Sequence, residues 1–284
     1  MQASENLVLA RELQHPRCLR DAYCNMGLAA FEVGKFAEAV VFLEQAIAQA
    51  VPPATPPLLV FGFELGLDAP FFCASAEFLL GYPARARQRV DSALAHVRDL
   101  PDILTRHMML VFACQAYQIA RDAVAVEQTA REMLELSRRY DLFGVDAEIF
   151  LEWSLAQQTR SPDAAERLSH HLEAYQQGEN YQLTYYFGLA AEAYAAADLH
   201  TEALALIDRS LALVERSGET FWRAELHRLR GASLLALGVD DGEADLRRAL
   251  VIARDQGARL LAMRSADDLA RLWQAQGRID RTLL

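Results

Sequence analysis

The chain has 284 residues, of which 52% are hydrophobic and only 9 are Pro and 14 Gly, a composition typical of a folded helical protein and not of a disordered one. Its net charge of −11, with Lys and Arg scattered along the chain, argues against direct binding of nucleic acid. No apolar run reaches the roughly 18 residues of a membrane span, and the N-terminus lacks the order of a signal peptide. We therefore expect a cytoplasmic protein that does not bind a membrane.

One pattern returns seven times along the chain. A small or polar residue stands in the middle of a predicted helix, a turn follows about seven residues later, and a second helix with an apolar stripe comes after the turn. The intervals between these central residues run from 38 to 47. Such a period predicts a stack of helical hairpins, none of which can bury its apolar faces alone. The central residues are Gly27, Ala74, Cys114, Glu152, Ala191, Gly231 and Ala270.

In chain order, residues 3–14 are predicted to form a helix that ends at His15-Pro16. This helix takes the place of a second helix, so residues 1–16 form a half-repeat. The repeats that follow are predicted to start near residues 17, 66, 104, 142, 181, 221 and 258.

The long interval between the first two repeats comes from the segment 51–66, VPPATPPLLVFGFELG. Its two Pro pairs interrupt any helix, so we predict a loop there. The last repeat turns at Gly277 and almost lacks its second helix. We therefore expect a single domain over 1–284 with about fourteen helices in seven hairpins and no strand, and a chain that is a piece of a larger polypeptide.

The first hairpin shows why the pattern is physical. Small residues at Gly27 and Ala39 would let the two helix backbones approach closely, while Tyr23, Met26 and Leu43 fill the space beside that contact. A spacing of three and four residues within each helix is that of one buried face.

Motifs for catalysis, cofactors and metals are poor. The run GLAAFEVGK from Gly27 has the wrong spacing for a phosphate loop and lacks the Ser or Thr. His170 and His171 point to different sides of a helix. The run Asp240-Asp241-Gly242-Glu243 is interpreted as a helix N-cap and not as a calcium loop. We predict no cofactor, no metal and no catalytic residue. The four cysteines form no CxxC pair and are expected to be reduced and structural: Cys18, Cys24, Cys73 and Cys114.

In stacked hairpins of this kind the first helix of each pair lines the concave face, which is where a binding groove is expected. An aromatic ring beside carboxylates and amides is typical of a site for an extended peptide or a small polar ligand. The alternative is that Trp153 packs against the neighbouring hairpin. The candidate groove residues are Gln115, Gln118, Asp146, Trp153, Tyr185, Glu192, Glu225 and Arg228.

The repeat resembles the tetratricopeptide (TPR) family in the small residue at position eight of the first helix and in the Ala, large apolar, Ala triplet of the second. Its longer period is similar to that of TPR regions in bacterial signalling proteins. The resemblance extends to the C-terminal part of multidomain proteins in which a class III adenylate/guanylate cyclase or a DNA-binding domain precedes an AAA/STAND-type ATPase. The run GETFWRAELHRLRG (218–231) is its most specific part. The run GFELGLDAPFF (62–72) departs from the Asp-Pro-Gly turn usual there, and nothing matches the cyclase or ATPase portions.

The resemblance implies an all-α, right-handed α-α superhelix that acts as a non-catalytic regulatory module. Such a module would hold a peptide, a protein partner or a small effector, and would report to an attached ATPase, cyclase or DNA-binding domain. Two alternatives stay open. One is self-association as a homodimer through the apolar surface of Leu269, Leu272 and Trp273. The other, disfavoured by the missing acid/base motifs, is an enzyme with a site inside the superhelix.

Overall fold

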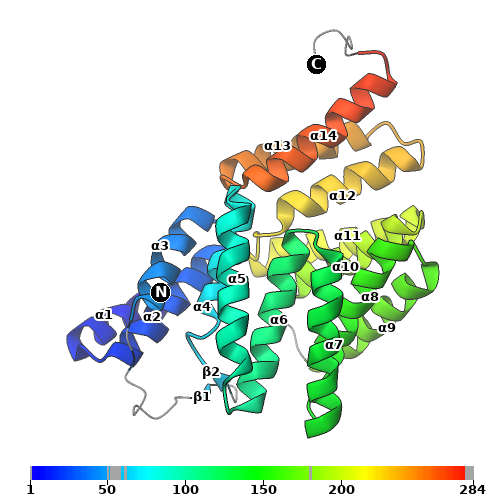
Figure 1. Cartoon of the computed structure of the whole chain (residues 1–284). Helices are drawn as coiled ribbons and strands as arrows, with labels where there is room; N and C mark the ends of the chain where they lie inside the picture. Colours follow the sequence, from blue (N-terminus) through cyan, green and yellow to red (C-terminus); the bar gives the residue numbers. More distant parts are fainter. Residues whose placement is uncertain (1, 50, 52–58, 61–62, 179–180, 279–284) are drawn as a thin grey trace. The chain divides into compact units, whose positions relative to one another are not determined.

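The computed structural model describes residues 2–49, 51, 59–60, 63–178 and 181–278. Within these residues it contains fourteen α-helices that follow one another along the chain (Figure 1), so the predicted number of helices is confirmed. The helices are α1 (Gln2–Leu13), α2 (Pro16–Glu32), α3 (Phe36–Ile47), α4 (Ala69–Leu80), α5 (Pro83–Arg98), α6 (Ile103–Ile119), α7 (Ala123–Tyr140), α8 (Val145–Thr159), α9 (Pro162–Gly178), α10 (Leu183–Ala196), α11 (His200–Ser217), α12 (Arg223–Ala236), α13 (Gly242–Asp255) and α14 (Arg259–Ala275).

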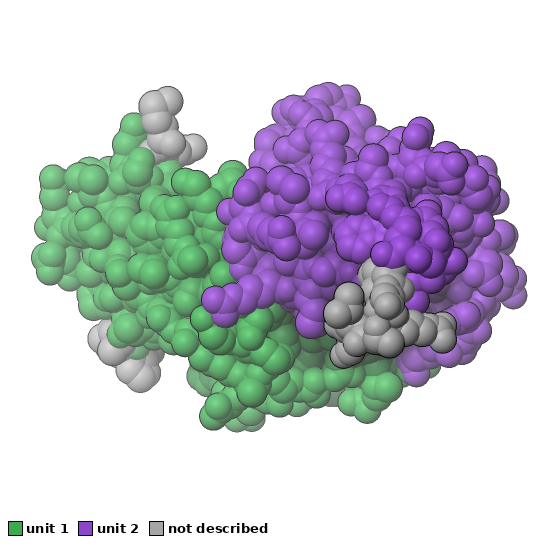
Figure 2. Space-filling view, turned by 90° about the horizontal axis from the view of Figure 1, so that it is seen from above, with its two compact units in different colours: residues 1–151 green, residues 152–284 purple. Residues whose placement is uncertain are grey.

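The chain divides into two compact units, Met1–Leu151 and Glu152–Leu284, which Figure 2 colours separately. Helix α8 starts in the first unit and ends in the second. Whether the repeats behave as one domain stays a prediction.

The absence of strands was a wrong prediction for the segment that joins α3 to α4. Two short strands, β1 (Leu59–Val60) and β2 (Phe63–Glu64), pair antiparallel there. The Pro pairs exclude a helix but permit extended backbone. Glu64 also ties this segment to the helices, because its N–H donates to Thr105 Oγ1 at 3.1 Å and its carboxylate accepts from Arg17 at 2.6 Å. The rest of the predicted loop, 52–58 and 61–62, lies outside the described residues.

Each hairpin places its two helices in different roles. The first helices pack on their own second helix and on the first helix of the next hairpin, as in α2 with α4, α4 with α6, α10 with α12 and α12 with α14. The second helices pack on the first helix that follows them, as in α5 with α6 and α11 with α12. Within each unit, no substantial contact joins one described second helix to the next. Successive second helices of the same unit therefore stand apart over a first helix.

The pattern of buried residues on each helix follows from this packing of first and second helices. Helices α4, α6 and α10 have helices on several sides and bury nearly consecutive residues along their length. The second helix α5 buries one stripe at the spacing of a single helix face, namely Ala86, Val90, Leu94 and Val97. The first helices thus form the interior and the second helices the outer layer.

Some glycines lie at close contacts between two helices. A Cβ added at Gly27 would meet Leu43 Cγ at 2.5 Å, as expected from the predicted close packing of the first hairpin. In the sixth hairpin the contact is between backbones, since a Cβ at Gly231 would lie 2.6 Å from the carbonyl oxygen of Gly242. A backbone atom cannot rotate away from such a contact as a side chain can.

We therefore expect Gly231→Ala to lower the free energy of unfolding by about 1–3 kcal/mol, because α12 and α13 must move apart to admit the methyl group. Urea denaturation followed by helical circular dichroism measures this. The matched control is Gly178→Ala in the last turn of α9, where the added Cβ would have no described atom within 4 Å apart from its chain neighbours and its own helix backbone. The control should be neutral or stabilise by up to about 1 kcal/mol. Equal effects of the two substitutions would contradict the close-contact explanation.

The start of α13 corrects a second prediction. Asp241 occupies the N-cap, but its side chain makes no capping hydrogen bond. Glu243 does not reach back to the cap either. Its carboxylate accepts from Arg247 at 2.8 Å, Arg278 at 2.6 Å and the indole nitrogen of Trp273 at 3.0 Å. These donors, Arg278 first, hold the pKa of Glu243 at about 2.

The four cysteines are free, and Cys24, Cys73 and Cys114 are buried. Burial raises the pKa of the Cys73 thiol to about 12, which keeps this side chain protonated and unreactive at neutral pH. Within the described part of the chain, no helix is both long enough and apolar enough to span a lipid bilayer.

Candidate functional site

The candidate groove residues are mostly interior. Asp146 is half-buried, and the other seven are buried: Gln115, Gln118, Trp153, Tyr185, Glu192, Glu225 and Arg228. The sequence placed them correctly on first helices. These helices are covered on several sides, however, so their polar side chains meet other protein groups. Whether any of the eight residues binds a ligand stays a prediction.

In the second unit, two of these residues do lie together. The indole nitrogen of Trp153 on α8 donates to Glu192 Oε2 on α10 at 2.9 Å, and Trp153 has no exposed surface. Tyr185 on α10 instead belongs to an aromatic cluster, with its ring centroid 5.4 Å from that of Trp222 and 5.8 Å from that of Phe221. The alternative interpretation of Trp153, packing against a neighbouring hairpin, agrees with this geometry.

Glu225 and Arg228 form a buried ion pair on α12, and both side chains also contact charged residues of α14. Arg228 donates to Glu225 Oε1 at 2.7 Å and to Asp268 Oδ2 at 2.7 Å. Arg264 of α14 approaches Glu225 at 3.5 Å. Burial alone would lower the pKa of Arg228, but the carboxylates of Glu225 and Asp268 raise it above its ordinary value. This group connects two successive first helices.

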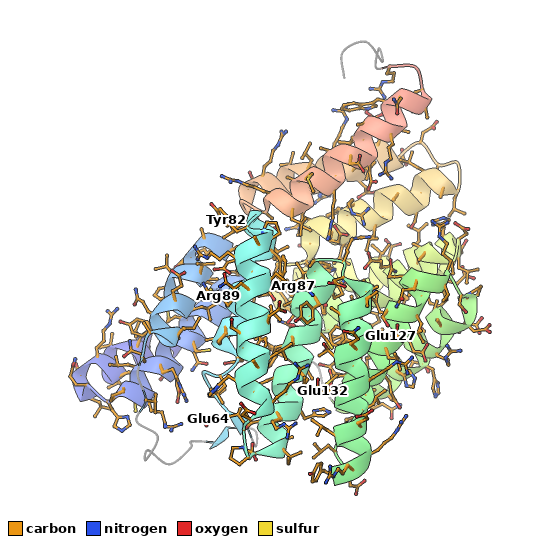
Figure 3. All side chains as sticks on the ribbon, viewed as in Figure 1. Glu64, Tyr82, Arg87, Arg89, Glu127 and Glu132 are labelled. Carbon is orange, nitrogen blue, oxygen red and sulfur yellow. The ribbon has the colours of Figure 1, made fainter. Side chains whose placement is uncertain are left out.

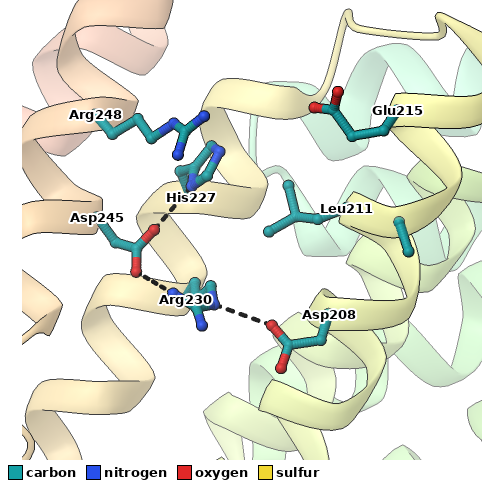
Figure 4. A pocket seen from close by; sticks show the side chains of 8 residues that line it. Asp208, Leu211, Glu215, His227, Arg230, Asp245 and Arg248 are labelled. Atoms are coloured by element: carbon teal, nitrogen blue, oxygen red, sulfur yellow. Dashed lines mark hydrogen bonds and ion pairs between the residues drawn. The ribbon is translucent and has the colours of Figure 1, made fainter.

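An open pocket lies on the outer side of the second unit, between α11, α12 and α13 (Figure 4). Its volume is about 340 Å³. It occupies the furrow between two second helices, with the first helix α12 as its floor. The lining residues are Asp208, Leu211, Ala212, Glu215, His227, Arg230, Asp245 and Arg248. None of them was singled out from the sequence. We call this site the α11–α13 pocket.

Arg230 holds two carboxylates of the α11–α13 pocket in place. It donates to Asp208 Oδ1 at 3.0 Å and also to Asp245 Oδ2 (Figure 4). The third carboxylate, Glu215, pairs with Arg223 at 3.1 Å. Every carboxylate that lines the pocket therefore has an arginine partner.

His227 forms the base of the pocket and is buried. Its Nδ1 lies 2.8 Å from Asp245 Oδ1. Because that carboxylate also accepts from Arg230, Nδ1 is the donor and Nε2 is the remaining ring nitrogen. Burial lowers the pKa of His227, and Arg248 and Arg223 lower it further, while Asp245 opposes the change. The imidazole is thus kept neutral over a wider pH range than a free histidine.

Arg248 differs from the other cations of the pocket. Its side chain is exposed beside His227, as Figure 4 shows, and it forms no ion pair with any described residue. Among the described residues that line the pocket, the charge without an ion-pair partner is therefore the positive charge of Arg248.

A smaller pocket of about 260 Å³ lies at the corresponding place of the first unit, between α5, α6 and α7. Its cations are engaged. Arg87, labelled in Figure 3, lies 4.8 Å from the ring centroid of Tyr117 and pairs with Asp122 and, at 3.3 Å, with Asp91. Arg98 pairs with Glu132 at 2.7 Å. The two pockets occupy the same position in the repeat. Only the α11–α13 pocket has an arginine, Arg248, without an ion pair to a described residue.

A sequence signal for these pockets existed. Asp91 and Asp208 each follow a buried residue of the second-helix stripe, Val90 and Ile207, and so occupy the same register of two repeats. Both line a pocket. The binding face was expected on the other side of each hairpin, among the first helices, so neither residue was predicted as a site residue. Among the described residues, no three His, Cys, Asp or Glu are grouped as metal ligands.

The sequence matches no protein-family model, and no curated protein matches it significantly. The structure resembles the crystal structure of the apo form of RapI, with a TM-score of 0.50 over 90% of this chain and 97% of that chain. The two sequences are 12% identical, so the likeness concerns the fold alone. Together with the fourteen helices, it shows that the chain folds as an all-α, TPR-like helical-repeat solenoid.

Proposed function

We propose that the chain is a non-catalytic regulatory module that binds a protein, a peptide or a small effector. The observation that carries this proposal is the α11–α13 pocket, where polar groups from three helices converge on an open space of about 340 Å³. Ligand sites are commonly concave spaces with a few oriented polar groups. The first helices already join the repeats, so the outer furrow is available for a ligand.

The finer part of the proposal concerns the protein to which the module belongs. The repeat period and the run 218–231 resemble the TPR regions of bacterial signalling and transcription-regulating proteins. This supports a role in which ligand binding is reported to an attached ATPase, cyclase or DNA-binding domain. The fold likeness to RapI is compatible with such a scaffold.

The enzyme alternative has one point in its favour, which is the hydrogen bond between His227 and Asp245. A histidine oriented by a carboxylate can act as a general base. No Ser, Thr, Cys or Lys lines the α11–α13 pocket, however, so the pair has no nucleophile to activate there. Binding is the function that this set of side chains supports.

Self-association is the other alternative, and the residues expected to drive it are largely covered. Leu269 is buried, and Leu272 and Trp273 are half-buried. Arg247 and Arg278 also lie over the Trp273 ring, at 5.2 and 5.6 Å from its centroid. A homodimer through this surface stays a hypothesis.

The test of the proposal is a thermal-shift screen of the whole chain against a panel of short peptides and small effectors. A ligand at 100 times its Kd should stabilise the folded chain by about 2.7 kcal/mol, which raises the Tm measurably. The variant Ala212→Trp fills the pocket from its exposed wall, and Ala205→Trp, two turns earlier on α11, is the matched control. We expect the shift to disappear in Ala212→Trp and to persist in Ala205→Trp. A panel without any stabilising ligand would contradict the proposed function.

A further inference from the structure

We propose that the α11–α13 pocket takes the carboxylate or phosphate group of a small effector, with Arg248 as its binding cation and His227 as a second contact that gains a proton when the anion binds. This inference rests on the proposed function and names the chemical class of the ligand.

The carboxylates of the pocket are already paired with arginines. Asp208 and Asp245 are held by Arg230, and Glu215 is held by Arg223. A cationic ligand would have to displace an existing arginine from any of these carboxylates. Arg248 has no such partner among the described residues and can bind an anion without breaking an ion pair. Guanidinium groups bind carboxylates and phosphates in bidentate geometry.

His227 lies beside Arg248 in the pocket (Figure 4). The charged groups that face His227 come from three helices. From α13 they are Asp245 and Arg248, and from α12 itself Arg223 and Arg230, of which Arg230 shares the Asp245 carboxylate with His227. From α11, Asp208 and Glu215 line the same pocket.

The other helices that pack on α12 bring their charged groups elsewhere. Arg264 and Asp268 of α14 bind Glu225 and Arg228, and Glu192 of α10 binds Trp153. The groups of the pocket itself therefore set the electrostatic environment of His227.

The charges of Arg248 and His227 are coupled. The positive charge of Arg248 opposes protonation of His227. A bound anion cancels that charge and adds an acceptor, so it raises the pKa of His227. By linkage, protonation of His227 must strengthen anion binding by the same factor. The affinity should therefore rise as the pH falls.

The size of the pocket limits the size of the ligand. A volume of about 340 Å³ is at the lower end of the range for small-molecule pockets. It admits an anionic group and a few further atoms. This favours a small effector over the surface of a folded partner.

The experiment measures binding of defined anions to the whole chain by isothermal titration calorimetry. Succinate and inorganic phosphate at pH 7.5 represent the two anion types. We expect Arg248→Gln to weaken whichever anion binds by about tenfold or more, since a charge-assisted contact is lost. Arg254→Gln removes an exposed arginine from the same helix outside the pocket and should change the affinity by less than about twofold.

The proton coupling is tested with sulfate, whose charge is constant between pH 5.5 and 7.5. The wild-type affinity should rise several-fold toward pH 5.5, and titrations in two buffers of different ionisation enthalpy should show proton uptake. His227→Gln should bind with little dependence on pH. The proton-uptake measurement needs no variant, so it decides the coupling even where His227→Gln fails to fold.

Three outcomes would overturn the inference: no binding of any of the three anions, equal affinity in Arg248→Gln, or binding without proton uptake. These outcomes are separable from a failure of the proposed function. A neutral or cationic ligand that stabilises the wild type but not Ala212→Trp would support a binding module and still refute the anion site.

Discussion

Replacing Trp153 by Ala should lower the free energy of unfolding by about 3–5 kcal/mol, the range for a buried tryptophan. Its side chain has no exposed surface and joins α8 to α10 through the hydrogen bond to Glu192. The substitution removes a large apolar volume and also deprives Glu192, itself buried, of a donor. Because folded domains are stable by only 5–15 kcal/mol, this loss should shift the urea midpoint strongly.

Trp273 provides a matched control for Trp153. Its indole nitrogen also donates to a glutamate, Glu243, at 3.0 Å, but the ring is half-buried on α14. Trp273→Ala should therefore cost clearly less, about 1–2 kcal/mol, since less apolar surface returns to water. A small loss in Trp153→Ala together with a large one in Trp273→Ala would contradict the burial of Trp153. A large loss in Trp153→Ala would make Trp153 a structural residue and remove it from the groove.

Replacing Arg228 by Met should lower the free energy of unfolding by about 3–5 kcal/mol, the usual cost of removing one partner of a buried ion pair. The expected cause is Glu225, which has no exposed surface and would lose its shortest ion pair, that to Arg228, while the contact to Arg264 is longer at 3.5 Å. Thermal and urea unfolding measure the loss. The double substitution Arg228→Met with Glu225→Leu removes both charges and should recover much of the stability.

The control for Arg228 is a surface ion pair in the same unit. Arg271 and Asp267 pair at 2.7 Å on α14, and both side chains are mostly exposed. Arg271→Met should change the stability by less than about 0.5 kcal/mol. If the double substitution were as unstable as Arg228→Met alone, the loss would come from packing and not from an uncompensated charge.

Much of the fold could be predicted because it depends on local periodicity. The small residues at Gly27 and Gly231 predicted two close helix contacts, and both exist. The Pro pairs in the segment 51–66 predicted a loop, but they could not show that β1 and β2 pair in its described part. Glu64 of β2 is also bound by Arg17 of α2 and Thr105 of α6, which are distant from it in sequence.

The site was harder to predict. The sequence register identified first-helix residues such as Gln115 and Trp153, but not how completely other helices cover them. It also gave no sign that Glu243 would bind Trp273 and Arg278 instead of capping α13. Contacts of this kind join residues about 30 positions apart, so no local pattern encodes them.

The sequence by itself determined that this chain is a series of helical hairpins, because the spacing of small and apolar residues fixes which face of each helix is buried. Only the tertiary structure decided where polar groups converge. His227, Asp245 and Arg248 come from two helices, and Asp208 and Glu215 come from a third, α11. Their pairing depends on the angle and separation of helices in neighbouring repeats. Those quantities follow from the packing of whole side chains and are absent from any one helix's pattern.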